Sequence, residues 1–165
     1  MSMIYNVCSM SESGIKKLLA SPEEITAVLY EDKEGFDKGE GIDLDKSWGG
    51  IHFLLTGADM GGGEPPLNFL FETYNVVGDV DVGYGPARAM MASDVAKVAA
   101  ALSKITDEEL KARFDPKKMT KLGIYPDIWD EGDEALEYCM SCFEELKKYI
   151  AQVASKKLGL LLWMN

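Results

Sequence analysis

Residues 42–57, with the sequence IDLDKSWGGIHFLLTG, form the stretch around which we interpret the rest of the chain. Its apolar residues recur at steps of four, three and four, which is the spacing of one face of a helix. They are Leu44, Trp48, Ile51 and Leu55. We expect Asp43 or Asp45 to cap the start of this helix and Gly57 to end it in a left-handed turn.

Gly49 and Gly50 lie inside the expected helix. A glycine costs roughly 1 kcal/mol relative to alanine at an interior helix position. A helix tolerates that cost where another segment packs closely against its backbone. We therefore expect a close contact at these two positions.

The composition predicts a single soluble domain covering residues 1–165. Apolar residues make up 47% of the chain and aromatic residues 10%, a content that argues against disorder. Asp and Glu number 28 against 17 Lys and Arg, which gives a net charge of −11. This charge argues against nucleic acid and against an anionic membrane surface as the main partner. It is compatible with a basic protein partner, with a cation, or with solubility alone.

Other features favour a cytoplasmic location. Three cysteines, an odd number, and nine methionines suit a reducing compartment. The first ten residues, MSMIYNVCSM, lack the basic region and long apolar run of a signal peptide. The longest apolar run, residues 160–164, is too short to cross a bilayer.

Short strands are expected at both ends of the chain, at residues 3–10 and 160–164, with helices between them. The longest helix carries an apolar stripe at steps of three and four, formed by Leu136, Cys139, Phe143, Leu146, Ile150 and Val153. Earlier helices are signalled at Ser11, at Ser21 before Pro22, at Ser93, at the Thr106 capping box and at Asp115 before Pro116.

The remaining segments give weaker patterns. Residues 31–41 and 58–66 are expected to be loops, residues 67–74 a short helix and residues 76–82 an irregular stretch. Together these patterns predict an α+β fold in one domain. Its small mixed or antiparallel sheet includes the N- and C-terminal strands and is packed by several helices.

The order of the segments resembles the YfbM-like family of uncharacterised bacterial proteins. The specific motifs are Asp-Leu-Asp-Lys-x-Trp at residues 43–48 and Tyr-Gly-Pro-Ala-Arg at residues 84–88, followed by RFDPKKM, IYPDIW and the long C-terminal helix. In that family a histidine often follows the tryptophan, where this chain has Gly49. The resemblance covers nearly the whole chain and implies a single α+β domain. It implies no activity.

A small charged site is one candidate for function. Asp43, Asp45 and Lys46 would form it with Arg88 if the turn at residues 84–88 folds against the expected helix. An arginine held by a Gly-Pro turn suits anion binding. The alternative is a helix cap tied by a structural ion pair. His52, the only histidine, is either an acid–base group or a polar residue at the edge of the core.

Other motifs point to packing and turns. Cys139 and Cys142 have C-x-x-C spacing but lie within the long helix, where nothing lowers a thiol pKa, so we interpret them as packing residues. The glycine clusters at 61–63 and 83–85 lack the rest of a phosphate or dinucleotide motif. We expect no cofactor and no metal site.

Aromatic residues near the motifs, Trp48, Tyr84, Tyr125 and Trp129, suit either a binding surface or the rim of a core. Two functions remain open. The preferred one is a cytoplasmic protein-interaction module, regulatory or immunity-type, that uses an acidic surface bearing these aromatics. The other is a small-molecule-binding protein or enzyme with a cleft formed by the two family motifs. The residues expected to line that cleft are Asp45, Lys46, His52, Tyr84 and Arg88.

Overall fold

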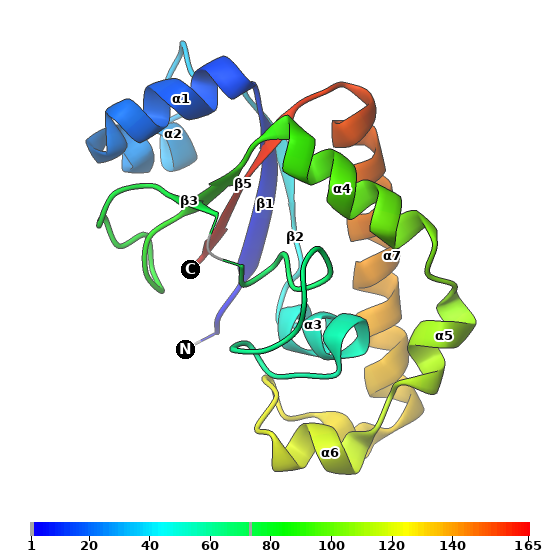
Figure 1. The fold of residues 1–165 in the computed structure, drawn as a ribbon. Helices are drawn as coiled ribbons and strands as arrows, with labels where there is room; N and C mark the ends of the chain where they lie inside the picture. Colours follow the sequence, from blue (N-terminus) through cyan, green and yellow to red (C-terminus); the bar gives the residue numbers. More distant parts are fainter. Residues whose placement is uncertain (1, 73) are drawn as a thin grey trace.

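A five-stranded antiparallel sheet runs through the centre of the protein in the computed structural model, which describes residues 2–72 and 74–165 (Figure 1). Its strands lie side by side in the order β2-β1-β5-β4-β3. In chain order they are β1 (Tyr5–Met10), β2 (Lys38–Asp43), β3 (Asn75–Val76), β4 (Arg88–Met90) and β5 (Gly159–Met164).

The two terminal strands are neighbours in the sheet, as the sequence predicts. β1 pairs with β5 along its whole length, so that Val7 lies opposite Leu162. β5 is flanked by β1 and β4, and its residues Leu160, Leu161 and Leu162 are fully buried. The α+β fold with both ends of the chain in one sheet is therefore confirmed, and the sheet is antiparallel.

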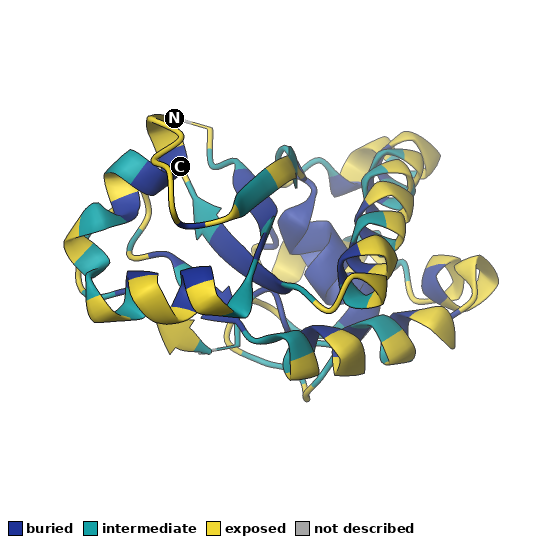
Figure 2. Ribbon diagram, turned by 90° about the horizontal axis from the view of Figure 1, so that it is seen from above, coloured by how far each residue is buried: buried dark blue, intermediate teal, exposed yellow. Residues whose placement is uncertain are grey.

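Alternate residues of the central strands face two separate cores. Tyr5, Val7 and Leu162 belong to the larger core, which lies under α3 (Trp48–Thr56), α4 (Ala92–Ser103) and α7 (Asp133–Ser155). Cys8, Met10 and Leu161 belong to the smaller core, under α1 (Glu12–Ala20) and α2 (Ile25–Tyr30). Seen from above, the buried strands lie between these two groups of helices (Figure 2).

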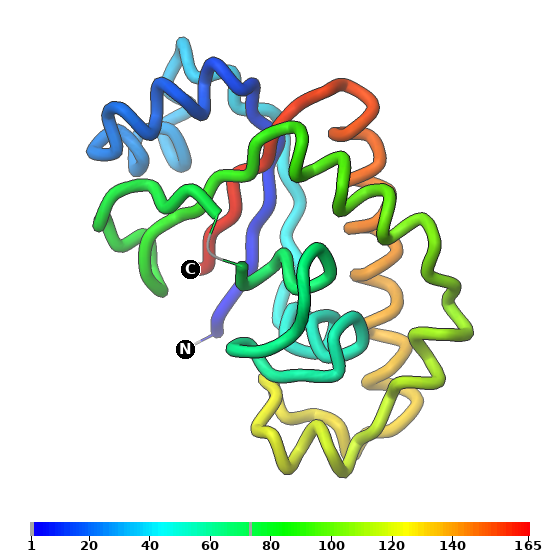
Figure 3. Tube along the Cα trace, in the orientation of Figure 1, coloured from blue at the N-terminus to red at the C-terminus, as the bar shows by residue number. Residues whose placement is uncertain are grey.

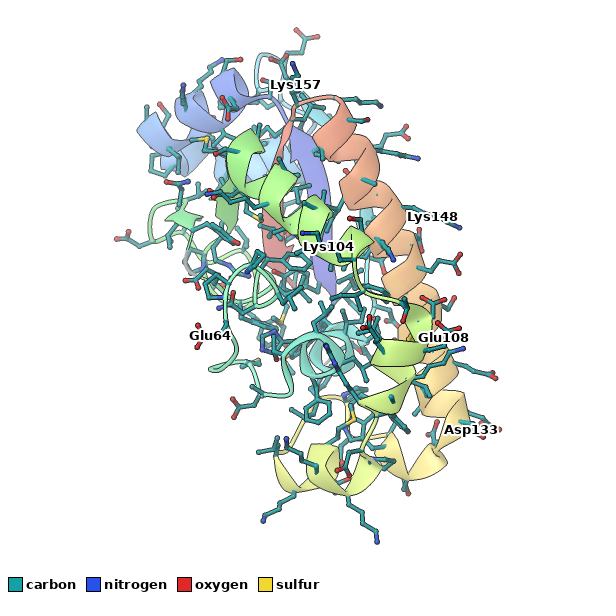
Figure 4. All side chains as sticks on the ribbon, turned by 45° about the vertical axis from the view of Figure 1, so that its right-hand side comes forward. Glu64, Lys104, Glu108, Asp133, Lys148 and Lys157 are labelled. Atoms are coloured by element: carbon teal, nitrogen blue, oxygen red, sulfur yellow. The ribbon has the colours of Figure 1, made fainter. Side chains whose placement is uncertain are left out.

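The long helix α7 has the predicted apolar stripe, with Cys139, Phe143, Leu146, Ile150 and Val153 buried. Its other face is charged, and Lys148 projects outward there (Figure 4). The Lys148 ammonium lies 3.0 Å from the Glu144 carboxylate. None of the helices in the described ranges is both long and apolar enough to cross a membrane.

Two short helices complete the larger core. α5 (Asp107–Ala112) begins with the predicted capping box, in which the Thr106 and Glu109 side chains bond each other's backbone N–H groups. α6 (Pro116–Lys121) is capped by the Asp115 carboxylate, which accepts a hydrogen bond from the backbone N–H of Lys118.

The predicted strand and helix boundaries are wrong at several places. The expected loop 31–41 contains part of β2, a strand hidden by Gly39 and Gly41, because glycine disfavours strands. Gly41 is required there: a Cβ atom at this position would lie 2.6 Å from the carbonyl oxygen of Val7 on β1. Ser21 leads into a short 3₁₀ turn, Pro22–Glu24, and its side chain does not cap it.

Further corrections concern the helix starts. Ser93 lies inside α4, whose capping residue is Met91. Residues 67–72 form turns in place of the expected helix 67–74, whose residue 73 lies outside the described ranges. Helix α3 starts at Trp48, later than expected, because Asp45 adopts a left-handed conformation, with φ 45°. Its predicted end at Gly57, with φ 73°, is confirmed.

The close contacts expected at the two helix glycines are present. A Cβ atom on Gly49 would lie 2.5 Å from the carbonyl oxygen of Tyr125. A Cβ atom on Gly50 would lie 2.5 Å from the Cys139 sulfur and 2.6 Å from the Trp129 ring. Only glycine lets α3 approach these two segments so closely.

Replacing Gly50 by alanine separates helix propensity from packing. Propensity alone would stabilise α3 by about 1 kcal/mol. We expect Gly50→Ala to destabilise the protein by about 1–3 kcal/mol instead, because its Cβ would clash with the Cys139 sulfur and the Trp129 ring. Urea unfolding measures the change. Gly61→Ala, whose Cβ would have no neighbour closer than 3.8 Å, is the control and should change stability little. A stabilised Gly50→Ala protein would contradict the close packing.

Candidate functional site

Trp48, the first residue of α3, is the centre of an aromatic cluster. Its ring stacks on Tyr125, with centroids 4.9 Å apart and an angle of 14° between the planes. Phe71 packs edge-to-face with it, with the ring centroids 5.5 Å apart. The indole N–H donates to the carbonyl oxygen of Met3 at 2.9 Å, and the backbone N–H of Met3 donates to the Tyr125 hydroxyl at 3.2 Å. Four segments that are distant in sequence therefore meet at one side chain.

A cleft of about 580 Å³ lies beside this cluster. Four of its lining residues come from separate segments: Trp48 from α3, Asp59 from the following loop, Tyr84 from the turn before β4, and Tyr125 from the turn after α6. The other lining residues are Met3, Gly49, Met60, Gly61, Leu122, Gly123, Ile124 and Met164. Figure 3 shows the segment after α6 passing beside α3. The described lining of the cleft is thus largely apolar, with Asp59 as its one charged side chain.

The rim of the cleft exposes large apolar side chains. Met60 is 54% exposed, Tyr84 42% and Leu122 39%. Only Tyr30 and Val76 are comparably exposed elsewhere among the described residues. Apolar side chains that gather in this way on a surface are typical of contact sites.

The predicted aromatic residues differ in their positions. Trp48 is 1% exposed and forms the floor of the cleft, while Tyr125 is half-buried above it and Tyr84 stands on the rim. Trp129 is fully buried, and its indole N–H donates to the carbonyl oxygen of Ile124 at 2.7 Å. Trp129 is therefore a core residue and does not line the cleft.

Arg88 is committed to the backbone of its own chain. Its guanidinium donates to the carbonyl oxygens of Glu72, at 2.9 Å, and of Leu70. It also donates to the Tyr5 hydroxyl at 2.7 Å, and that hydroxyl donates to the Leu70 carbonyl oxygen. Burial raises the pKa of Tyr5 to about 12, so the hydroxyl keeps its proton. These bonds join the sheet to the 67–72 turns. Arg88 therefore has a structural role in place of the expected anion binding.

The charged residues of the first family motif lie elsewhere. Asp43 accepts a hydrogen bond from the backbone N–H of Asp45 at 2.9 Å, which forms the turn before α3. The Tyr138 hydroxyl donates to the Asp45 carboxylate at 2.6 Å and accepts from the backbone N–H of Lys46 at 3.0 Å. The expected group of Asp43, Asp45 and Lys46 around Arg88 is not formed. The two carboxylates accept hydrogen bonds in the turn before α3 and from Tyr138, while the Arg88 guanidinium donates to backbone carbonyl groups.

His52 is 1% exposed and lies behind the cleft wall. Its Nε2 atom is 2.8 Å from the carbonyl oxygen of Asp59 and 3.1 Å from that of Gly62. Because both partners are acceptors, Nε2 carries the hydrogen. The ring also packs edge-to-face with Phe71, with the ring centroids 5.0 Å apart. His52 thus fixes the loop that supplies Asp59, Met60 and Gly61, and it does not line the cleft itself.

Other predicted motifs have packing or turn roles. Burial raises the pKa of Cys139 to about 12 and also raises that of Cys142, so neither is an activated thiol. The Asp81 carboxylate accepts from the backbone N–H groups of Gly83 and Gly85, the groups that a phosphate would need. In the described ranges no three His, Cys, Asp or Glu side chains are grouped to hold a metal ion.

Sequence reasoning missed Asp59, Met60 and Leu122. The segments that contain these residues carry no functional motif. The three residues join one surface only because α3, the 58–63 loop and the 122–125 turn pack together. One signal was present in the sequence: Met60 and Leu122 are large apolar residues next to glycines in loops, where few core residues are expected.

Burial makes His52 a source of pH-dependent stability. Desolvation disfavours the charged ring and lowers its pKa below the ordinary 6.5, although the two carbonyl oxygens and the Asp59 charge oppose this. Below pH 6.5 the unfolded chain therefore binds the proton that the folded chain does not. The contribution of neutral His52 to the free energy of unfolding should be fully present above pH 6.5. It should fall as the pH drops below 6.5, by at most about 1.4 kcal/mol per pH unit.

Urea unfolding between pH 7.5 and 5.5 tests this expectation. His52→Gln, which keeps a side-chain N–H and removes the titration, should show a flatter dependence. The wild-type and variant curves share the titration of the carboxylates, so their difference isolates His52. Identical pH dependence in the two proteins would contradict the assignment.

The comparisons with known proteins agree with this fold. The solved structure of YfbM from Escherichia coli, a protein of unknown function, matches with a TM-score of 0.76 at 20% sequence identity, over 98% of this chain and 99% of that chain. No curated protein matches. A family model described as "Domain of unknown function (DUF1877)" matches residues 1–163, as the motif resemblance to the YfbM-like proteins led us to expect. The chain therefore belongs to the DUF1877 family.

Proposed function

We propose that this chain is a protein-interaction module whose contact surface is the cleft beside Trp48 and its rim. The observation that carries the proposal is the rim itself, where Met60, Tyr84 and Leu122 are between 39% and 54% exposed. A partner protein would cover these side chains, whereas a small molecule inside the cleft would leave much of the rim in water. Methionine and tyrosine are common at such contacts, because methionine adapts its shape and tyrosine is rigid and amphipathic.

The rigid walls of the cleft support the same proposal. Tyr125 is held from one side by the Trp48 ring at 4.9 Å and at its hydroxyl by the backbone N–H of Met3. The loop at residues 59–61 is held by His52. Because both walls are fixed in advance, a partner would lose little free energy in ordering them.

A small-molecule site in the same cleft is a second candidate. A volume of about 580 Å³ lies within the range of ligand pockets, and three residues of the expected binding set, Trp48, Tyr84 and Tyr125, line it. Of the five residues expected to form an enzyme-like cleft, Asp45, Lys46, His52 and Arg88 do not line it. Catalysis therefore has less support than binding.

Site-specific photo-crosslinking in the cells that encode the chain tests the proposal. A benzophenone amino acid at position 122 should give defined protein adducts. The same group at position 76, an exposed apolar position that is 40% accessible and does not line the cleft, should not. The adducts at position 122 should disappear when the rim is made polar by Met60→Ser with Tyr84→Ser, because the apolar contact area is lost.

Adducts that form equally from both positions, or that persist in the double variant, would overturn the proposal. A crosslinker at position 122 that yields no protein adduct, together with a small ligand that raises the melting temperature, would favour the second candidate. The wild-type and variant proteins should first be shown to unfold at similar urea concentrations, which excludes loss of fold as the cause.

A further inference from the structure

We propose that the group bound in the cleft is the guanidinium end of an arginine side chain from a basic partner. This inference rests on the proposed function and specifies the chemistry of the partner's anchor. It follows from three properties of the lining: the sign of its charge, the aromatic rings and the apolar walls.

The charge on the described lining of the cleft is negative. Among the lining residues that the structure describes, Asp59 is the only one with a charged side chain, and none is a lysine or arginine. No ion pair in the described ranges involves Asp59, whose carboxylate accepts a hydrogen bond from the backbone N–H of Gly61 at 3.2 Å. Glu64 follows on the same loop and points outward (Figure 4). With a net charge of −11, the chain attracts a cationic partner and repels an anionic one.

The aromatic rings suit a planar cation. Tyr84 and Tyr125 come from different segments and both line the cleft. The protein already places lysines over aromatic rings elsewhere, Lys17 over Phe36 at 4.3 Å and Lys118 over Phe53 at 5.5 Å. Neither cleft tyrosine has such a partner within the described part of the chain. A guanidinium stacks on tyrosine and bonds a carboxylate through two N–H groups, which an ammonium cannot do.

The apolar walls suit the stem of the same side chain. Met60, Leu122 and Ile124 line the cleft and would contact methylene groups. An arginine presents three methylenes below its charged end, so one side chain can bury its stem and keep its charge beside Asp59. A purely apolar side chain would leave the Asp59 carboxylate partly desolvated and unpaired, which is unfavourable.

Titration with small probes, followed by NMR of the full chain, tests the inference. The probes are n-butylguanidinium, n-butylammonium and n-butylurea, the last being a neutral compound of nearly the same shape as the first. We expect n-butylguanidinium to shift the Gly61 and Gly123 amide signals and the Met60 methyl signal. Its dissociation constant should be roughly fivefold lower than that of n-butylurea, with n-butylammonium between them. Added salt should weaken only the binding of the cations.

Two matched variants assign the effect to Asp59. Asp59→Asn should remove the preference for the cation while keeping the side-chain oxygen that bonds Gly61. Asp133→Asn makes the same change of charge at the start of α7, outside the lining, and should keep the preference (Figure 4). Loss of the preference in both variants would indicate a general charge effect and overturn the role of Asp59.

Two other results would overturn the inference, with different consequences for the proposed function. If n-butylurea shifts the same signals with the same dissociation constant, the cleft selects apolar groups without regard to charge, and the interaction module stands without an arginine anchor. If no probe shifts the cleft signals, the arginine anchor is wrong, and the crosslinking result alone decides the proposed function.

Discussion

The position of Trp48 is the constraint on which the rest of the structure depends. Its ring stacks on Tyr125 and packs edge-to-face with Phe71, and its N–H donates to the carbonyl oxygen of Met3. The side chain therefore links α3 to the segment before β1, to the 67–72 turns and to the turn after α6. A buried tryptophan satisfies this arrangement because its large apolar ring fills the junction while its one donor finds an acceptor.

This junction imposes conditions on its neighbours. α3 must approach the Tyr125 backbone, Cys139 and Trp129 closely, and glycine at positions 49 and 50 permits that approach. The turns at residues 67–72 must keep their inward carbonyl groups bonded, and Arg88 and Tyr5 supply the donors. The cleft is a consequence of these conditions, since its walls are the surfaces of segments that the junction brings together.

The sequence was most informative where one element carries its own pattern. The apolar stripe of α7, the Thr106 capping box and the buried strand β5 follow from local spacing and composition. β2 was missed because its glycines are selected by contact with β1, not by strand propensity. The candidate site was predicted only in part: Trp48, Tyr84 and Tyr125 meet, but Arg88 and His52 bind carbonyl groups whose positions depend on the path of distant turns. Asp59 and Leu122 join the cleft through the same long-range packing, which no local pattern encodes.

A nuclear Overhauser spectrum of the protein in solution tests the central role of Trp48 most directly. The indole N–H signal of Trp48 is assigned by its absence from a Trp48→Phe variant. We predict strong cross-peaks between the Trp48 ring and the Tyr125 and Phe71 rings, and an indole N–H that exchanges slowly with water because it is buried and bonded to Met3. A rapidly exchanging indole N–H, without contacts to Tyr125, would contradict the junction and the cleft that depends on it.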